Sequence, residues 1–401
     1  GAGASDLEPP REVHLAYGPG PPIRGIGPPV ARPSPSAWNP VDASSPSSRA
    51  KLGDIAAAAG LHRIHLLAWR DLDDVEAGGS EVHAANVARL WAEAGIEVTM
   101  RTSYAQGHPP ADVRDGYHVI RKAGRYLVFP RAAFTEATGR HGPRDGLVEI
   151  WNGMPFLSPL WARQPRVVWL HHVHGDMWKM VLPPRLAAMG QTLEHRIAPA
   201  LYRRTRIVTL SDSSKRQLVS ELHFRDELVS VVPPGIDPQF SPGGERSPVP
   251  LVVAVGRLVP VKHFDDLIRT MAAVREQRPD ATLTIVGEGY ERKALDQLVR
   301  DLDAEDWVTF AGRVTDEELV DLYRRAWVVA SASSHEGWGM TLTEAAACGT
   351  PAVATRISGH LDAVAEGTGG LLARDEREMR DQLVSVLSDR DVLDRLSQGA
   401  L

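Results

Sequence analysis

The stretch that decides the fold covers residues 327–355 and reads WVVASASSHEGWGMTLTEAAACGTPAVAT. Its apolar start, 327–332, predicts a buried strand, because a short continuous apolar run is typical of a strand covered on both faces. A polar loop follows, and the helical spacing over 341–348 ends at Gly349. Residues 352–355 predict a second strand, so the stretch is a β-loop-α-β unit.

The same alternation continues through the second half of the chain. Strands that alternate with helices predict a parallel sheet covered by helices on both faces. In such a sheet, ligands bind beyond the carboxyl ends of the strands. The further predicted strands are 251–255, 281–286 and 307–311, and the further predicted helices are 263–277, 291–302, 316–326 and 376–388.

A second α/β unit precedes this one. Residues 63–69 predict a buried strand, 80–94 a helix and 97–100 the next strand. An aperiodic run rich in proline and glycine, 238–248, separates the two units. We therefore predict two domains in series, over 61–240 and 241–401. The other strands expected in the first domain are 147–150, 166–170, 206–210 and 228–232, with helices at 185–203 and 213–222.

Residues 1–60 differ from the rest. Eleven of the first 50 residues are proline, which cannot donate backbone hydrogen bonds inside a helix or a sheet. We predict a proline-rich arm that is extended or disordered. An arm laid over the domain surface is the alternative.

Composition excludes several classes of function. The net charge of -6, from 45 basic and 51 acidic side chains, gives no positive field for a nucleic-acid backbone. The single cysteine, Cys348, excludes an intramolecular disulfide and favours a reducing compartment, so we expect a cytoplasmic protein. We find no apolar run of about 18 residues, so we expect no membrane-spanning helix. We find no basic start followed by an apolar segment, so we expect no secretory signal.

Two short motifs suit a phosphorylated ligand. Gly78 and Gly79 lie between a strand and a helix, where bare backbone can approach a phosphate or a sugar hydroxyl. A plain tight turn is the alternative. Arg257 and Lys262 follow the strand 251–255, at the end where a parallel sheet binds ligands. These cations could neutralise a diphosphate, or they could be a solvated surface pair.

Two glutamates frame the loop and helix after residue 331. Glu336 lies in the loop and Glu344 one turn into the helix, with Gly337 and Gly339 allowing close backbone approach. One carboxylate could hold sugar hydroxyls and the other a ribose diol. A carboxylate favoured by the helix dipole at 344 and a solvated one at 336 are the alternative.

Three histidines follow the strand 166–170, at positions 171, 172 and 174. A metal site is disfavoured, because no cysteine is near and Asp176 is the one clear carboxylate partner. A positioned imidazole at the strand end, His171, is the favoured interpretation.

Together these segments resemble the retaining glycosyltransferases of family 4, which have the GT-B fold: two Rossmann-like domains whose parallel sheets face each other across a cleft. The resemblance runs from about Leu61 to Leu396. One departure is the run Ser358-Gly359-His360, where the family often has Gly-Gly followed by glutamate. The motifs that carry the resemblance are 231–242, 255–262, 285–289 and the E-x7-E segment 333–344 with its continuation to 351.

The resemblance implies a role for each candidate residue. His171 would contact the transferred sugar, while Arg257 and Lys262 would bind the diphosphate and stabilise it as it leaves. Glu336 would hold sugar hydroxyls, and Glu344 would bind the ribose. The rest of the predicted donor site is Gly78, Gly79, Arg313, Val314, Gly337, Trp338, Gly339, Met340 and Thr341.

The resemblance also implies retention of anomeric configuration. We expect a nucleotide-sugar co-substrate and neither a metal ion nor another cofactor, because the cations and helix starts could stabilise the leaving diphosphate. Asp71-Leu72-Asp73 has the spacing of a metal-binding motif. It lies in a loop of the first domain, and we expect its carboxylates to be solvated.

The acceptor, a small molecule, a glycan or a lipid, should meet the first domain near Asn152, Met154 and Trp178. A cluster of four arginines could form a membrane-surface patch, although a solvated helix face is favoured. These arginines are Arg196, Arg203, Arg204 and Arg206.

Other functions stay open. A GT-B sugar-nucleotide epimerase, a glycoside phosphorylase or an inactive nucleotide-sugar-binding scaffold would share the fold. A nicotinamide-dependent oxidoreductase is excluded, because Arg292 replaces the third glycine of the dinucleotide-binding pattern that begins at Gly287.

Overall fold

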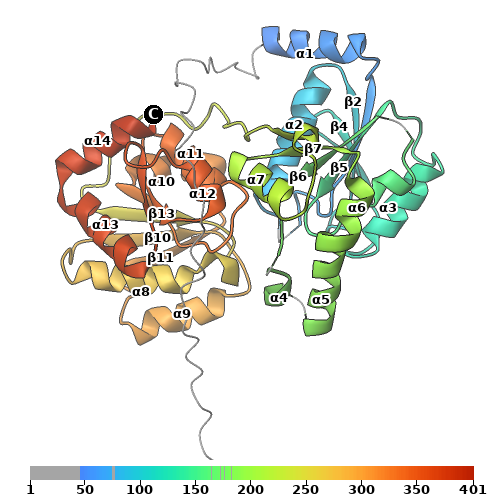
Figure 1. The fold of residues 1–401 in the computed structure, drawn as a ribbon. Helices are drawn as coiled ribbons and strands as arrows, with labels where there is room; N and C mark the ends of the chain where they lie inside the picture. Colours follow the sequence, from blue (N-terminus) through green and yellow to red (C-terminus); the bar gives the residue numbers. More distant parts are fainter. Residues whose placement is uncertain (1–45, 75–76, 164, 172, 176, 182) are drawn as a thin grey trace, which may run out of the picture. The chain divides into compact units, whose positions relative to one another are not determined.

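The computed structural model describes residues 46–401 except 75, 76, 164, 172, 176 and 182. Most of the predicted arm, with His172 and Asp176, therefore lies outside the described residues. Residues 43–401 form one compact unit that contains two sheets, of eight and six strands (Figure 1). None of the described helices is long and apolar enough to cross a membrane.

The first sheet has the strand order β3-β4-β2-β1-β5-β6-β7-β8. All neighbouring strands are parallel except β3 and β4, which form an antiparallel pair. The strands are β1 (Arg63–Leu67), β2 (Glu97–Thr102), β3 (Ala111–Arg114), β4 (Tyr117–Arg121), β5 (Gly146–Trp151), β6 (Arg166–Leu170), β7 (Arg206–Thr209) and β8 (Val229–Val231).

Helices α1 to α7 belong to the same half of the chain. The helix predicted over 185–203 is interrupted by a π turn, Leu193–Ile197, in which Glu194 is buried. The helices are α1 (Pro46–Ala58), α2 (Gly79–Glu93), α3 (Val128–Ala137), α4 (Met177–Val181), α5 (Pro184–Thr192), α6 (Ala198–Tyr202) and α7 (Asp212–Ser220), with 3-10 turns at Ser158–Leu160 and Asp226–Leu228.

The second sheet is parallel throughout and has the order β11-β10-β9-β12-β13-β14. Its strands are β9 (Leu251–Val255), β10 (Thr282–Val286), β11 (Val308–Gly312), β12 (Val328–Ser331), β13 (Ala352–Thr355) and β14 (Gly370–Ala373). Its helices are the 3-10 turn η5 (Pro260–Lys262), α8 (Phe264–Arg275), α9 (Arg292–Asp301), α10 (Asp316–Arg325), α11 (Met340–Ala347), α12 (Ser358–Ala363), α13 (Glu376–Ser388) and α14 (Arg390–Ala400).

Strand β9 explains why this sheet has two apolar layers. Its residues alternate between the two faces, so Val252 and Ala254 pack in one core cluster, while Leu251 and Val253 pack in the other. A strand buried on both faces is read as a continuous apolar run, as the sequence predicts.

The prediction that the arm extends to residue 60 is wrong at its end, because residues 46–58 form α1. No proline occurs between residues 47 and 62, and the alanines at 56–59 favour helix. The helix packs on α2: Ala56 joins the apolar cluster that contains Leu66 and Ala84, and Arg49 Nη1 lies 2.6 Å from Glu93 Oε2.

Candidate active site

The loop after β12 holds Glu336 in a fixed position. Ser333 Oγ donates a hydrogen bond to Glu336 Oε1 at 2.9 Å, and Lys262 Nζ makes a close ion pair with the same oxygen. Burial disfavours the charged carboxylate, but Lys262, His360 and these hydrogen bonds outweigh burial and lower the pKa of Glu336. Glu336 is therefore an ionised group paired with a cation, and the structure brings it together with Lys262.

The divergent run 358–360 supports this loop from α12. A Cβ on Gly359 would lie 2.5 Å from the Glu336 carbonyl oxygen and 2.8 Å from the Trp338 nitrogen, so the backbone segments touch where only glycine fits. The buried His360 ring contacts the Thr355 carbonyl oxygen through Nδ1 at 2.8 Å. Gly359 and His360 thus pack α12 closely against this loop and the end of β13.

Lys262 reaches Glu336 across the carboxyl end of β9. A Cβ on Gly256 would lie 3.2 Å from Lys262 Cε, so the glycine gives the lysine stem its path. Gly287, with φ +132°, lies against Gly256, and a Cβ there would be 2.0 Å from the Gly256 carbonyl oxygen. Glycines at the ends of β9 and β10 therefore let the two strand ends pack tightly under the cation.

Gly78 and Gly79 face the second half of the chain. A Cβ on Gly78 would lie 3.2 Å from Arg257 Nε, and one on Gly79 would lie 3.1 Å from Met340 Sδ. Gly78 also caps α2, where its N–H donates to Glu81 Oε2 at 2.8 Å. The structure thus brings three predicted donor-site segments together: 78–79, Arg257 and the start of α11.

Glu344 lies on α11 and lines a cavity of about 320 Å³. Tyr323 Oη donates to Glu344 Oε2 at 3.0 Å, and burial raises the pKa of Glu344. Met340 lines the same cavity. The other lining residues come from both halves of the chain: Leu72, Val82, Ala85, Asn86, Gly235, Ile236, Asp237, Gln239, Phe240, Asp316 and Thr343.

His171 lies at the end of β6 and is 3% exposed. Its Nε2 lies 3.1 Å from Nδ1 of His83 on α2. Burial, with a smaller effect of His83, lowers the pKa of His171 to about 3. The ring is therefore neutral at pH 7.

The acceptor candidates are held by contacts within the protein. Asn152 Nδ2 donates to Ser80 Oγ at 3.0 Å, and Trp178 Nε1 donates to the buried Glu194 at 3.1 Å. Met154 packs on the apolar cluster that contains Phe156. The buried His174 ring packs on the Trp178 ring and lies against Gly153, where a Cβ would be 2.9 Å from His174 Nε2.

The remaining predicted donor residues lie after β11 and in the loop and first turn that lead into α11. Arg313 is largely exposed, with Nε 3.8 Å from Glu288 Oε2. Val314 packs against the apolar cluster that contains Leu251 and Val253. Gly339 caps α11 with φ +112°. Three other predicted residues, Gly337, Trp338 and Thr341, are half-buried in the loop and first turn.

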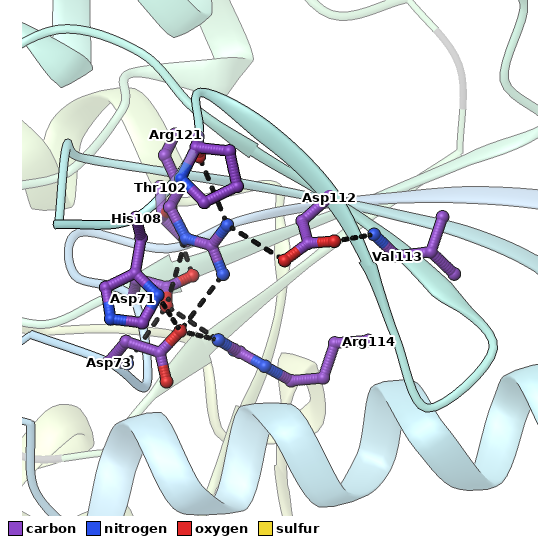
Figure 2. A network of polar contacts seen from close by, with 9 residues as sticks. Asp71, Asp73, Thr102, His108, Asp112, Val113, Arg114 and Arg121 are labelled. Carbon is purple, nitrogen blue, oxygen red and sulfur yellow. Dashed lines mark hydrogen bonds and ion pairs between the residues drawn. The ribbon is translucent and has the colours of Figure 1, made fainter.

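The prediction that the Asp71-Leu72-Asp73 carboxylates are solvated is wrong for Asp71, whereas Asp73 is partly exposed. Asp71 is fully buried, and Figure 2 shows both carboxylates held by Arg114 and Arg121. Arg114 Nη2 lies 3.0 Å from Asp71 Oδ1, and Arg121 Nη2 lies 3.1 Å from Asp73 Oδ2. Burial disfavours the charge on Asp71, but hydrogen bonds from Asp73 and Arg114 and the charges of both arginines lower its pKa. This ion-pair cluster anchors the start of the loop from β1 to Gly78.

Several supporting residues escape prediction. Ser333, Thr355 and His360 fix Glu336 and its loop, Tyr323 binds Glu344, and His83 contacts His171. The signal for His83 is present in retrospect, since it lies one helical turn after Gly79 on the face that packs on β6. The others require knowledge of which segments meet.

Two family models match consecutive parts of the chain. The model described as Glycosyltransferase Family 4 matches residues 77–240, and the model described as Glycosyl transferases group 1 matches residues 236–401. A D-inositol 3-phosphate glycosyltransferase of Nocardiopsis dassonvillei is 36% identical, with 75% of this chain and 78% of that protein covered. One from Corynebacterium urealyticum is 31% identical, with 79% and 84% covered.

Solved structures share the arrangement of elements. A sucrose-phosphate synthase from Thermosynechococcus elongatus has a TM-score of 0.73 at 20% identity, with 84% of this chain and 93% of that chain covered. Anabaena Alr3699/HepE, solved with UDP and glucose, has a TM-score of 0.65 at 20% identity over the same shares. Likenesses at this identity establish the fold alone.

Proposed function

This chain belongs to glycosyltransferase family 4 and has the GT-B fold, and we propose that it transfers a sugar from a nucleoside diphosphate sugar to an acceptor hydroxyl, with retention and without a metal ion. The observation that carries the proposal is the ion pair between Lys262 and the ionised Glu336, at the carboxyl ends of the second sheet. A carboxylate for sugar hydroxyls and a cation for phosphate thus stand side by side.

In the proposal, the cations stabilise the negative charge that develops in the reaction. As the bond from the anomeric carbon to the diphosphate oxygen breaks, negative charge builds on the diphosphate. Fixed cations stabilise that charge without reorganisation at the moment of reaction. In the proposal, Arg257 and Lys262 supply them, and the N-terminus of α11 adds its partial positive charge.

The cavity beside α11 suits the nucleoside. In the proposal, Glu344 accepts hydrogen bonds from the ribose hydroxyls. These would replace the hydrogen bond that Tyr323 donates to Glu344. Burial raises the pKa of Glu344 because it disfavours the charged carboxylate. Hydrogen bonds from ribose hydroxyls would stabilise that charged form and offset the effect of burial.

Retention follows from a same-face attack. The acceptor oxygen bonds to the anomeric carbon on the side that the diphosphate leaves, and its proton passes to a phosphate oxygen. No carboxylate nucleophile is needed in this scheme. Glu336, already engaged by Lys262 and Ser333, would orient the sugar.

Activity in EDTA tests the independence from metal. Among the described residues, His263, Asp265 and Asp266 are the one group of three ligand-bearing side chains whose donor atoms lie within 4.8 Å of one another. They follow Lys262 directly, so a loss of transfer in EDTA would direct attention to them and contradict the metal-independent proposal.

The first acceptor to test is an inositol phosphate, because the similar proteins from N. dassonvillei and C. urealyticum are named for it. Conversion of the donor in the absence of any acceptor would instead indicate an epimerase. Binding without turnover of donor would indicate a scaffold.

A thermal-shift screen against UDP, GDP, ADP, TDP and their sugars, with and without EDTA, tests the donor site. A ligand at about 100 times its dissociation constant stabilises the fold by about 2.7 kcal/mol. We expect a shift with one nucleotide family that survives EDTA and is lost in Lys262→Ala. No shift with any nucleotide at millimolar concentration would contradict the proposal.

A further inference from the structure

His83 and His171 form a contact that fixes where a proton lies. Their rings meet edge to face, with centroids 5.3 Å apart and planes at 88°. His83 Nδ1 lies 3.1 Å from His171 Nε2, a hydrogen-bond distance. Two lone pairs, or two N–H groups, could not face each other at this distance, so one ring donates and the other accepts.

Neither ring carries a charge at neutral pH. Burial lowers the pKa of His83, and burial with a smaller contribution from His83 lowers the pKa of His171 to about 3. A neutral imidazole has one N–H, so the proton in the contact determines the other nitrogen as well. If His83 donates, His171 carries its own proton on Nδ1; if His171 donates through Nε2, its Nδ1 is an acceptor.

The second nitrogen of His171 is unsatisfied. Within the described part of the chain, Nδ1 of His171 is buried without a hydrogen-bond partner. A buried polar atom that lacks a hydrogen bond raises the free energy of the folded state, and a bound ligand that supplies the hydrogen bond would remove this cost. A hydroxyl of the donor sugar is the partner that the proposed function provides.

The ring of His83 is itself held in place. Trp169 on β6 packs against His83 with centroids 5.4 Å apart, and Trp91 on α2 packs against Trp169 at 5.7 Å. Residues 169 and 171 alternate with 170 and so share a side of the sheet, and 83 and 91 lie on one stripe of the helix. The aromatic row leaves His83 oriented toward His171.

We propose that His83 is a positioning residue for the transfer reaction: it fixes the tautomer and ring orientation of His171, so that Nδ1 of His171 presents one defined hydrogen-bonding character to a hydroxyl of the donor sugar. This inference rests on the proposed function. His83 acts through His171, so its removal should affect turnover while nucleotide binding persists.

Two variants of the full-length chain separate this role from packing. His83→Phe keeps the ring and removes the nitrogen, whereas His83→Asn keeps a polar atom near the position of Nδ1. We expect His83→Phe to lower kcat at least about tenfold, with the affinity for the free nucleoside diphosphate within about twofold, and His83→Asn to recover most of the activity. His118→Asn is the control, because His118 is exposed on β4 of the eight-stranded sheet, and its activity should match that of the wild type.

Ring nitrogen-15 chemical shifts give a readout besides activity. We expect one tautomer of His171 in the wild-type protein and a mixture in His83→Phe. A His171→Ala, His83→Phe double variant should be no slower than His171→Ala alone, because the two residues act as one unit. Unchanged His171 shifts in His83→Phe, kcat within twofold of wild type, or additive losses would overturn the inference. If the wild type transfers no sugar, the proposed function fails, while the nitrogen-15 shifts still test the coupling.

Discussion

The Lys262–Glu336 pair has to exchange partners when a donor binds. The diphosphate would compete for Lys262 Nζ, and sugar hydroxyls would replace part of the lysine's contact with Glu336. We predict that Lys262→Ala weakens nucleoside diphosphate binding and lowers kcat/KM by about 100-fold or more, since a fixed cation at a developing charge is worth that much.

Glu336→Gln should leave nucleotide affinity nearly unchanged and lower kcat, because the amide cannot match the carboxylate as an acceptor for sugar hydroxyls. Steady-state kinetics and calorimetric titration with the nucleoside diphosphate measure both variants, with the exposed Arg377→Ala as the control. Equal losses of nucleotide affinity in the two variants would contradict this division of roles.

The buried histidines make stability depend on pH. Burial lowers the pKa of His171 and His174 to about 3, against about 6.5 in an unfolded chain. Between these values the unfolded state binds more protons, so stability falls as pH falls below about 6.5. Each histidine should cost about 1 kcal/mol of unfolding free energy between pH 7 and pH 5.5.

Urea unfolding at several pH values measures this loss. His171→Gln should remove about half of the decrease that the two histidines cause, while the exposed His118→Gln should not alter it. A decrease of unchanged size in His171→Gln would show that His171 is not held neutral.

At the residue scale, sequence predicts chemistry at strand ends better than it predicts partners. Position after a strand indicates Arg257, Lys262 and His171 without any contact being known. Burial of Asp71 could not be predicted, because its partners Arg114 and Arg121 come from β3 and β4, more than 40 positions away.

At the scale of elements, α12 supports the donor loop through Gly359. A Cβ at this position would force the backbone of 336–338 to move. We predict that Gly359→Ala lowers stability by about 1–3 kcal/mol and weakens nucleotide-sugar binding.

Gly124→Ala is the matched control, because a Cβ there meets nothing within 4 Å and its φ is ordinary. Thermal unfolding and the nucleotide thermal shift measure both variants. A Gly359→Ala protein with wild-type stability and binding would show that the contact is unimportant.

The run of helix from α5 to α6 combines basic and exposed apolar side chains. Leu186, Met189 and Ile197 are about half exposed or more. The exposed Arg196 lies on the same helical run, and the exposed Arg203 and Arg204 lie in the turn that follows α6. The membrane-surface alternative would use such basic and exposed apolar side chains together, and it can be tested against the solvated helix face that the sequence favours.

We predict that the protein pellets with vesicles of anionic phospholipid, and that Arg196→Glu, Arg203→Glu and Arg204→Glu together weaken pelleting at least about tenfold. The same reversal at Arg374, just before α13, and at Arg377 and Arg380 on α13 changes the net charge equally and should have little effect. Equal losses in both triple variants would reduce the interaction to net charge.

Apolar periodicity predicts the longer elements and misses the short polar ones. The bounds of β6, β9, β13 and α13 agree with the prediction. Strand β3 has no buried residue, so periodicity carries no signal for it, and it exists because β4 pairs with it. The exposed residues of such a hairpin are read as a loop.

At the scale of the whole molecule, the fold is predictable because most strands contain buried apolar residues and many connections contain a helix. The contact between α7 and α12 is not, since it joins Ser213 to residues nearly 150 positions later: Ser213 N–H donates to Asp362 Oδ2 at 3.2 Å, and Ser213 Oγ to the Ser358 carbonyl oxygen at 3.0 Å. Such contacts bring first-half residues to α12, which also carries Gly359.

A proton NMR time course in EDTA tests whether the transfer retains the anomeric configuration and proceeds without a metal ion. Wild-type protein is mixed with an α-linked nucleoside diphosphate sugar of the base that binds and with an inositol phosphate acceptor, and the anomeric proton coupling of the first product is read. We predict turnover in EDTA to an α-linked product. A β-linked first product, or turnover that stops in EDTA and returns with a divalent cation, would contradict it.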